Sequence, residues 1–380
     1  MHTLKETVKN YGFIDKRNES FLREHERKGF SFDKHDVIRQ AELSIVGQKQ
    51  PVSTIAELIL LWVDRLNKLD SGIDQDTLPR LRSFMLMGPT ASGKTYILKT
   101  ICKIMGFSVT VISCDGLTGA GWRGRSVENE MYRVAQKQQE DPENIHVVLF
   151  DEFDKMRASN RDLQECTTFN AQPNLLKLFD GGMYQGITDD SVHIPYELDT
   201  ERVLFIFAGA FSGIGKRYIA PRLKQESYDF NGKMLSQEDH ALIYSDDENL
   251  LRTKAEALDL LHWGIMSELA GRIGTIVSLP ALTEQELMSI INDSPRSLQN
   301  RFAHLLPEHV KFTIDNKAAH HIAQTALTSS LGARALESLL VPYVSQAAQK
   351  CRENPDVSSV KISLDSHQAL HIRFGTRRTQ

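Results

Sequence analysis

Runs of mostly apolar residues recur between residues 83 and 280, and helix-like segments separate them. One such segment, TYILKTICKIM, has apolar residues at helical spacing, which gives it one apolar face. Several of the runs are apolar at nearly every position, as strands covered on both faces of a sheet are. The runs are SFMLM, FSVTVIS, HVVLFDE, RVLFIFAGA and GTIVSLP. Strands that alternate with helices predict the α/β class, with a mostly parallel sheet flanked by helices.

The pattern changes after Pro280. Thr283 precedes Glu286 by three residues, which is the spacing of a helix capping box. Further helices are predicted at NKAAHHIAQTAL and at ARALESLLVPYVSQAAQK, where Pro342 is expected to kink or break the helix because it lacks a backbone N–H. Short strands are predicted at VKFTID, SVKISLD and ALHIRFG. We therefore expect a large domain over residues 42–280 and a small α+β domain over residues 281–380.

The first 41 residues are rich in charged side chains and poor in apolar ones. They predict a solvated, partly ordered arm, or alternatively a docking arm for a partner. The longest apolar run, IAELILLWV, is interrupted by Glu57 and is too short to span a bilayer, so it predicts a core helix. No apolar segment typical of a signal peptide opens the chain.

Bulk composition narrows the class of protein. The 380 residues carry a formal net charge of −4, which provides no general attraction to nucleic acid or to an anionic membrane. The four cysteines are scattered without a CxxC pair, which argues against a zinc site or a disulfide framework. A soluble protein of the reducing cytoplasm fits these features.

The stretch GPTASGKT matches the phosphate-binding loop pattern, with an apolar run before it and a helix-like segment after it. Its glycines allow backbone N–H groups to close around phosphate oxygens at a helix N-terminus. Lys94 would reach the β- and γ-phosphates, and the Thr95 hydroxyl would bind Mg²⁺. The predicted ATP-binding residues here are Gly88, Pro89, Thr90, Ala91, Ser92, Gly93, Lys94, Thr95 and Tyr96.

A second motif follows in HVVLFDEFDK, where four apolar residues deliver Asp151 and Glu152 to the end of a strand. Asp151 suits the metal side of the site, and Glu152 suits the polarisation of an attacking water. A small-molecule kinase would not need the second carboxylate. The pair therefore predicts an ATP hydrolase with Mg²⁺ as its metal.

Eight motifs in order carry a resemblance to one family: IVGQKQ, GPTASGKT, LTGAGWRGRSVENE, LFDEFDK, LLKLFDGG, LFIFAGAFSGI, ELAGRIG and LGARALE. From about residue 42 onward the chain resembles the AAA+ ATPases of the Clp/HslU branch, and within it the ClpX type of protein unfoldase. The resemblance implies that Ile45 and Val46 contact adenine. It also implies that Arg272 is an arginine finger acting in trans and that Arg334 is the sensor-2 arginine. It implies a homo-hexameric ring, because an arginine supplied across an interface makes hydrolysis depend on assembly.

GWRG stands where the family has its aromatic pore loop, so the resemblance implies that Trp122 grips an unfolded chain beside Arg123. Three family features are missing: the zinc-binding N-terminal domain, the peptidase-docking tripeptide and the basic entrance loop, where this chain has Asp189 and Asp190. The predicted function is an ATP-dependent unfoldase or remodelling chaperone that acts on a protein client, with a dedicated partner protein or peptidase. The alternative is an AAA+ motor or loader that acts on nucleic acid or a nucleoprotein complex.

Overall fold

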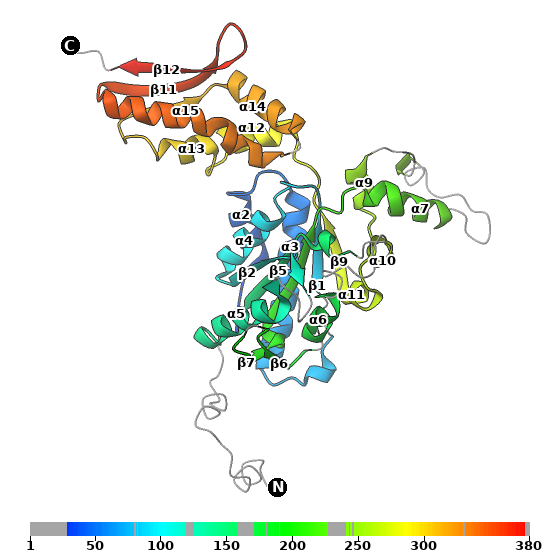
Figure 1. Cartoon of the computed structure of the whole chain (residues 1–380). Helices are drawn as coiled ribbons and strands as arrows, with labels where there is room; N and C mark the ends of the chain where they lie inside the picture. The colour runs from blue at the N-terminus through cyan, green and yellow to red at the C-terminus, as the bar shows by residue number, and fades with distance from the viewer. Residues whose placement is uncertain are drawn as a thin grey trace, which may run out of the picture.

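The computed structural model of the chain describes residues 29–79, 81, 83–118, 125–157, 171–179, 181–189, 191–226, 241–242, 244, 247–329 and 331–376. Most of the predicted charged arm lies outside these residues. Figure 1 shows two groups of elements, a larger one around a central sheet and a smaller one, orange and red, at the C-terminal end.

The larger group is built on a five-stranded sheet with the strand order β2-β5-β8-β1-β9. Every neighbouring pair in it is parallel. All five apolar runs of the sequence form its strands, so the predicted α/β class is confirmed. The strands are β1 (Ser83–Met87), β2 (Ser108–Ser113), β5 (His146–Asp151), β8 (Val203–Gly209) and β9 (Ile273–Ser278).

The central strands are apolar at consecutive positions because both faces of the sheet are covered. Phe84 and Leu86 of β1 pack into a core with helices of one face, whereas Met85 and Met87 pack into the core of the other. All five residues of β1 and all seven of β8 are buried. Side chains alternate across a strand, so a run without polar residues is required where neither face meets water.

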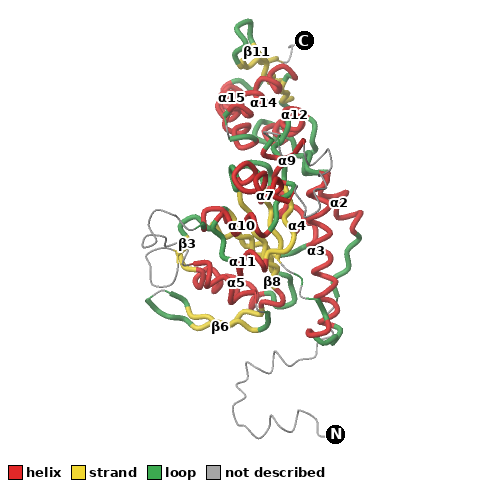
Figure 2. Tube along the Cα trace, turned by 90° about the vertical axis from the view of Figure 1, so that its right-hand side faces the viewer, coloured by secondary structure: helices red, strands yellow, loops and turns green. Residues whose placement is uncertain are grey.

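Helices cover the two faces of the sheet and join its strands (Figure 2). Helix α3 contains the segment predicted as a core helix, with Ile55, Ile59 and Val63 buried. Within the described part of the chain, no helix is both long and apolar enough to cross a membrane. The helices are α2 (Lys34–Glu42), α3 (Lys49–Asp70), α4 (Lys94–Met105), α5 (Val127–Glu140), α6 (Gln172–Leu176), α7 (Ala220–Glu226), α9 (Glu248–Arg252), α10 (Ala257–Trp263) and α11 (Ser267–Arg272), with a π-helix over Gly215–Ile219.

Helix α2 crosses the boundary expected between the arm and the large domain. Val37 and Ala41 on its inner face are buried in the same core as α3 and α4. Asp33 caps its N-terminus by accepting a hydrogen bond from the Asp36 amide. The end of the predicted arm is therefore packed in this structure, although its sequence is polar on the outer face.

Two pairs of short strands lie outside the main sheet and were not predicted from the apolar pattern. They are β3 (Leu117–Thr118) with β4 (Arg125–Ser126), and the antiparallel hairpin of β6 (Met183–Ile187) with β7 (Pro195–Asp199). The hairpin is attached to the first turn of α5, where the hydroxyl groups of Tyr184 and Tyr196 both donate to the Glu128 carboxylate. Its strands alternate between buried and exposed positions, a weaker signal than the central runs provide.

The small C-terminal domain has its own core and a three-stranded sheet in the order β10-β11-β12. The Thr283–Glu286 capping box is present at the start of its first helix, as the spacing predicted. All three expected strands form. The elements are α12 (Glu284–Asn292), α13 (Leu298–Ala303), β10 (Lys311–Ile314), α14 (Asn316–Thr328), α15 (Ala333–Glu353), β11 (Val357–Leu364) and β12 (Leu370–Thr376).

Pro342 does not break the last helix, which runs continuously from Ala333 to Glu353. Proline removes the hydrogen bond to the carbonyl four residues earlier, that of Ser338. Both Ser338 and Pro342 are exposed, so water can satisfy the freed carbonyl. The buried face of α15, which includes Leu336 and Leu340, packs into the domain core and stabilises the helix on either side.

Candidate nucleotide-binding site

The loop between β1 and α4 has a backbone that only certain residues tolerate. Gly93 has a φ of +93° and precedes the first helical residue, Lys94. A Cβ atom at Gly88 would lie 2.4 Å from the Leu279 carbonyl oxygen, so only glycine fits there. These constraints place the loop directly at the N-terminus of α4, where backbone N–H groups and the helix dipole favour an anion.

Lys94 projects from the first turn of α4 back over this loop. Its Nζ donates hydrogen bonds to the carbonyl oxygens of Gly88 at 2.7 Å and Pro89 at 2.9 Å. Burial lowers the pKa of Lys94 to about 8, while the negative charges of Asp151 and Asp154 act in the opposite direction. The ammonium is therefore held close to where phosphate oxygens would bind, in an environment that weakens its hold on the proton.

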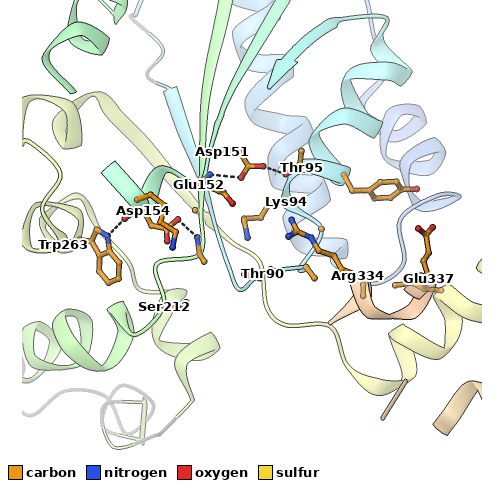
Figure 3. A pocket seen from close by; sticks show the side chains of 18 of the residues that line it. Thr90, Lys94, Thr95, Asp151, Glu152, Asp154, Ser212, Trp263, Arg334 and Glu337 are labelled. Carbon is orange, nitrogen blue, oxygen red and sulfur yellow. Dashed lines mark hydrogen bonds between the residues drawn. The ribbon is translucent and has the colours of Figure 1, made fainter. Parts of the chain in front are cut away.

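Thr95 and Asp151 meet across the gap between α4 and the end of β5. The Thr95 hydroxyl donates to Asp151 Oδ2 at 2.7 Å (Figure 3). A hydroxyl and a carboxylate oxygen at this separation fit the preferences of Mg²⁺, which takes few protein ligands and keeps water and phosphate oxygens. No cluster of three or more His, Cys, Asp or Glu side chains suited to a metal occurs in the residues described. A Mg²⁺ ion here would complete its coordination with nucleotide and water.

Glu152 follows Asp151 with a left-handed backbone, φ +58°, which turns its side chain away from that of its neighbour. Glu152 Oε2 accepts a hydrogen bond from the Ser113 hydroxyl at 2.9 Å. Ser113 ends β2 and pairs in register with Asp151. Sequence reasoning missed Ser113, although a polar residue at the end of an adjacent parallel strand is the signal that could have identified it.

Asp154, also missed, lies one turn further along and is almost fully buried. Its Oδ1 accepts a hydrogen bond from the Ala210 amide at the end of β8. Its carbonyl oxygen accepts one from Trp263 Nε1 of α10 at 3.1 Å. Asp154 therefore fixes the turn after β5 against the neighbouring strand and so holds Glu152 in place. Ser212, which follows on the same strand end, lines the pocket too.

These groups line one pocket of about 670 Å³ between the carboxyl ends of the strands and the small domain. From the large domain it is lined by Thr90, Ala91, Gly93, Lys94, Thr95, Tyr96, Asp151, Glu152, Asp154, Lys155, Arg157, Gly209, Ala210, Ser212 and Trp263. Figure 3 shows Lys94, Thr95, Asp151 and Glu152 grouped on this side, with Arg334 approaching from the other.

The small domain supplies the opposite wall. Arg334 and Glu337 reach the pocket from the first turns of α15, and Arg301 from α13 forms an ion pair with Glu337 at 2.5 Å. The glycine before α15, Gly332, has a φ of +52° and sits against Ala91 of the phosphate-binding loop. This close approach brings the start of α15 to the site. Neither Arg301 nor Glu337 was predicted as a site residue, although Glu337 ends the LGARALE motif.

Some predicted residues are not among those that line the pocket. These residues are Ile45, Val46, Gly88, Pro89 and Ser92. The Tyr96 hydroxyl, however, donates to the Ser44 carbonyl at 3.1 Å and so connects the pocket to the segment with Ile45 and Val46.

Arg272 is also not among the residues lining this pocket. It lies at the end of α11, where its Nη1 donates to the Leu176 carbonyl at 2.7 Å. Trp122 and Arg123 of the predicted pore loop lie outside the described residues, and so does Asp190.

Comparison with known proteins finds matches to two family models and similarity to curated relatives. Residues 84–215 match the ATPase family associated with various cellular activities (AAA), and residues 282–347 match the C-terminal, D2-small domain of ClpB protein. The chain is 26% identical over 308 residues to the ATP-dependent Clp protease ATP-binding subunit ClpX of Treponema denticola. That alignment covers 78% of this chain and 72% of the relative.

These matches are consistent with a ClpX-like AAA+ ATPase. The AAA domain contains the Lys94, Thr95, Asp151 and Glu152 group, and the D2-small match contains Arg334. The AAA domain and the similarity to ClpX support ATP hydrolase activity.

Proposed function

We propose that this ClpX-like AAA+ ATPase uses Mg-ATP hydrolysis to unfold or remodel a protein client as a homo-hexameric ring in the cytoplasm. One observation supports this proposal more strongly than the others. A single pocket gathers the phosphate-binding loop, two strand-end carboxylates and an arginine from a separate domain. A site divided between two domains can convert the state of a nucleotide into a relative movement of those domains.

The residues have distinct roles in this proposal. Lys94 and the loop amides bind the β- and γ-phosphates, and Ile45, Val46 and Tyr96 lie on the adenine side. Glu152, oriented by Ser113, takes up a proton from the attacking water. Thr95 and Asp151 hold Mg²⁺, which when bound neutralises charge on the phosphate oxygens. Arg334 contacts the phosphates from the small domain.

We assign the arginine finger to Arg272, acting on the nucleotide of the neighbouring subunit. Its absence from the residues that line the pocket of its own chain supports this assignment, because a group that acts in trans serves the nucleotide of another subunit. A cation supplied across a subunit interface would make hydrolysis depend on ring assembly.

The client is proposed to be a protein because the relative's printed name is that of an ATP-binding subunit of a protease. Trp122 and Arg123 are the proposed contacts with it. The missing peptidase-docking tripeptide and the acidic GITDDSVHIP segment, with Asp189 and Asp190, favour a dedicated partner protein or peptidase over the usual one. Arginines at the pore loop would favour acidic client segments.

The test is a partner capture combined with an unfolding assay. The Glu152→Gln protein, incubated with Mg-ATP, is expected to retain clients that can be identified by mass spectrometry. Trp122→Ala is expected to hydrolyse ATP at a rate within about twofold of wild type while losing at least about tenfold in client unfolding. Retention of nucleic acid alone, in a salt-sensitive manner, would instead favour the nucleic-acid motor.

A further inference from the structure

Gln48 connects the phosphate-binding loop to the segment between the two domains. Its side chain is 7% exposed, and its Nε2 donates to the Pro280 carbonyl at 2.8 Å and to the Ser92 carbonyl at 3.4 Å. Ser92 belongs to the loop that precedes Lys94, and Pro280 lies between β9 and α12. One amide group therefore contacts both the nucleotide-binding loop and the interdomain connection.

The backbone of Gln48 has a conformation that residues other than glycine rarely adopt. Its backbone has a φ of +56°, in the left-handed region where glycine is favoured. Its Oε1 is buried and has no hydrogen-bond partner within the described part of the chain. Glycine would suit this backbone and leave no unpaired oxygen, but it would lose the two hydrogen bonds that the Gln48 amide donates to Ser92 and Pro280.

The interdomain segment has other points of attachment, among them the close approach of Glu286 to Gly47. The Leu279 amide donates to the Met87 carbonyl at 2.7 Å, and the Ala281 amide donates to Asn249 Oδ1 at 3.2 Å. The first of these extends the main sheet, and the second connects to α9. Of these hydrogen bonds, only those of Gln48 also include Ser92 of the phosphate-binding loop, although Leu279 also lies against Gly88 of the same loop.

We propose that Gln48 is a positioning residue that couples occupancy of the phosphate-binding loop to the angle between the two domains. The inference rests on the proposed nucleotide site. The bond to Pro280, at 2.8 Å, has the ordinary length of an N–H···O hydrogen bond, whereas the contact with Ser92, at 3.4 Å, is longer than usual. A shift of the Ser92 carbonyl when the loop closes on phosphate changes the position of the amide. That displacement moves Pro280 and, with it, the start of α12.

The experiment uses full-length Glu152→Gln protein, so that ATP binds without turnover, with Gln48→Gly or Gln48→Met added. Glycine suits the backbone and removes the amide, while methionine keeps the volume and cannot donate. Asn249→Ala is the matched control, because it removes a hinge contact that does not reach the loop. ATP affinity is measured by titration, and hydrogen exchange is measured on a peptide over residues 279–288 with and without Mg-ATP.

Both Gln48 variants are expected to bind ATP about 5- to 10-fold more weakly and to lose the ATP-induced slowing of exchange in the hinge peptide. In Asn249→Ala, the Ala281 amide should exchange faster in the absence of ATP. This variant should nevertheless keep the ATP-induced slowing of exchange and bind ATP with an affinity within about twofold of the parent protein. The Gln48→Gly melting temperature should stay within about 3 °C of its parent, which separates coupling from folding.

Two results would overturn the inference. One is an intact ATP-induced slowing in both Gln48 variants, and the other is an ATP-binding parent whose hinge exchange does not change. Either result leaves the proposed ATP-driven function standing. A parent protein that binds no ATP would instead contradict the proposed function itself.

Discussion

The two walls of the nucleotide pocket are built in different ways. The large-domain wall is made of strand ends and a loop whose backbone leaves little freedom, with Gly88 against Leu279 and the Thr95 hydroxyl on Asp151. The small-domain wall is made of long charged side chains, Arg334, Glu337 and Arg301, that are exposed. The first wall is preorganised by the fold, whereas the second depends on where the hinge places the domain. We therefore expect the residues of the large-domain wall to bind ATP and take part in its hydrolysis. The residues of the small-domain wall are expected to respond to the position of the small domain.

The largest expected effect comes from changing Glu152 in the large-domain wall. Glu152→Gln keeps the size and the left-handed turn but cannot take up the proton of water. The rate of ATP hydrolysis should fall about 10²- to 10⁴-fold, while ATP affinity stays within about threefold, measured by phosphate release and by titration. Glu140→Gln, at the exposed end of α5, is the control and should hydrolyse normally. If Glu152→Gln lost ATP affinity as strongly as it loses the rate of hydrolysis, Glu152 would serve binding as well as turnover, and the large-domain wall would not assign these roles to separate residues.

A smaller effect is expected from Arg334 in the facing wall. Arg334→Ala removes one charge-assisted hydrogen bond to phosphate, worth about 1.5–3 kcal/mol, so turnover should fall about 10- to 100-fold. Arg301→Ala breaks only the exposed ion pair with Glu337 and should change turnover less than about threefold. Both are measured by steady-state ATP hydrolysis. Equal effects of the two changes would show that the small-domain wall acts through its general charge, not through Arg334.

The smallest effect is a pH dependence of ATP affinity that arises from Lys94. Burial lowers the pKa of Lys94 to about 8, and phosphate binding favours its charged form. Affinity should therefore be full below pH 8 and fall, by at most about tenfold per pH unit, as pH rises above 8. Lys94→Arg stays charged over this range.

Titrations of ATP between pH 7 and pH 9.5 in the Glu152→Gln background measure this effect. The Lys94→Arg variant should bind more weakly overall but with a flat profile. A decline in ATP affinity above pH 8 that persists in Lys94→Arg would show that the pH dependence arises from another group.

Local sequence was sufficient to predict that Lys94, Thr95, Asp151 and Glu152 belong to the large-domain wall, because each lies in a short motif. GPTASGKT encodes a loop, its glycines and the helix start in eight consecutive residues, and HVVLFDE places Asp151 and Glu152 at a strand end. The five strands of the sheet followed from runs that are apolar on both faces. The break considered at Pro342 does not occur, because packing of the buried face of α15 outweighs the lost hydrogen bond on its exposed side.

Contacts between distant segments could not be read from local patterns. Ser113 reaches Glu152 only because β2 pairs beside β5, and Asp154 holds Ala210 only because β8 is the next strand. Gln48 donates to the carbonyl of Pro280, which lies 232 residues later in the chain. In each case the residue type alone is ordinary.

The sequence by itself determined the fold class, the nucleotide-binding motifs and the presence of a second, smaller domain, because periodicity and short motifs are local properties of a chain. Only the tertiary structure decided which side chains share the pocket and which residue connects it to the hinge. Strand order and domain placement bring those groups together, and both result from the burial of apolar surface by the whole chain.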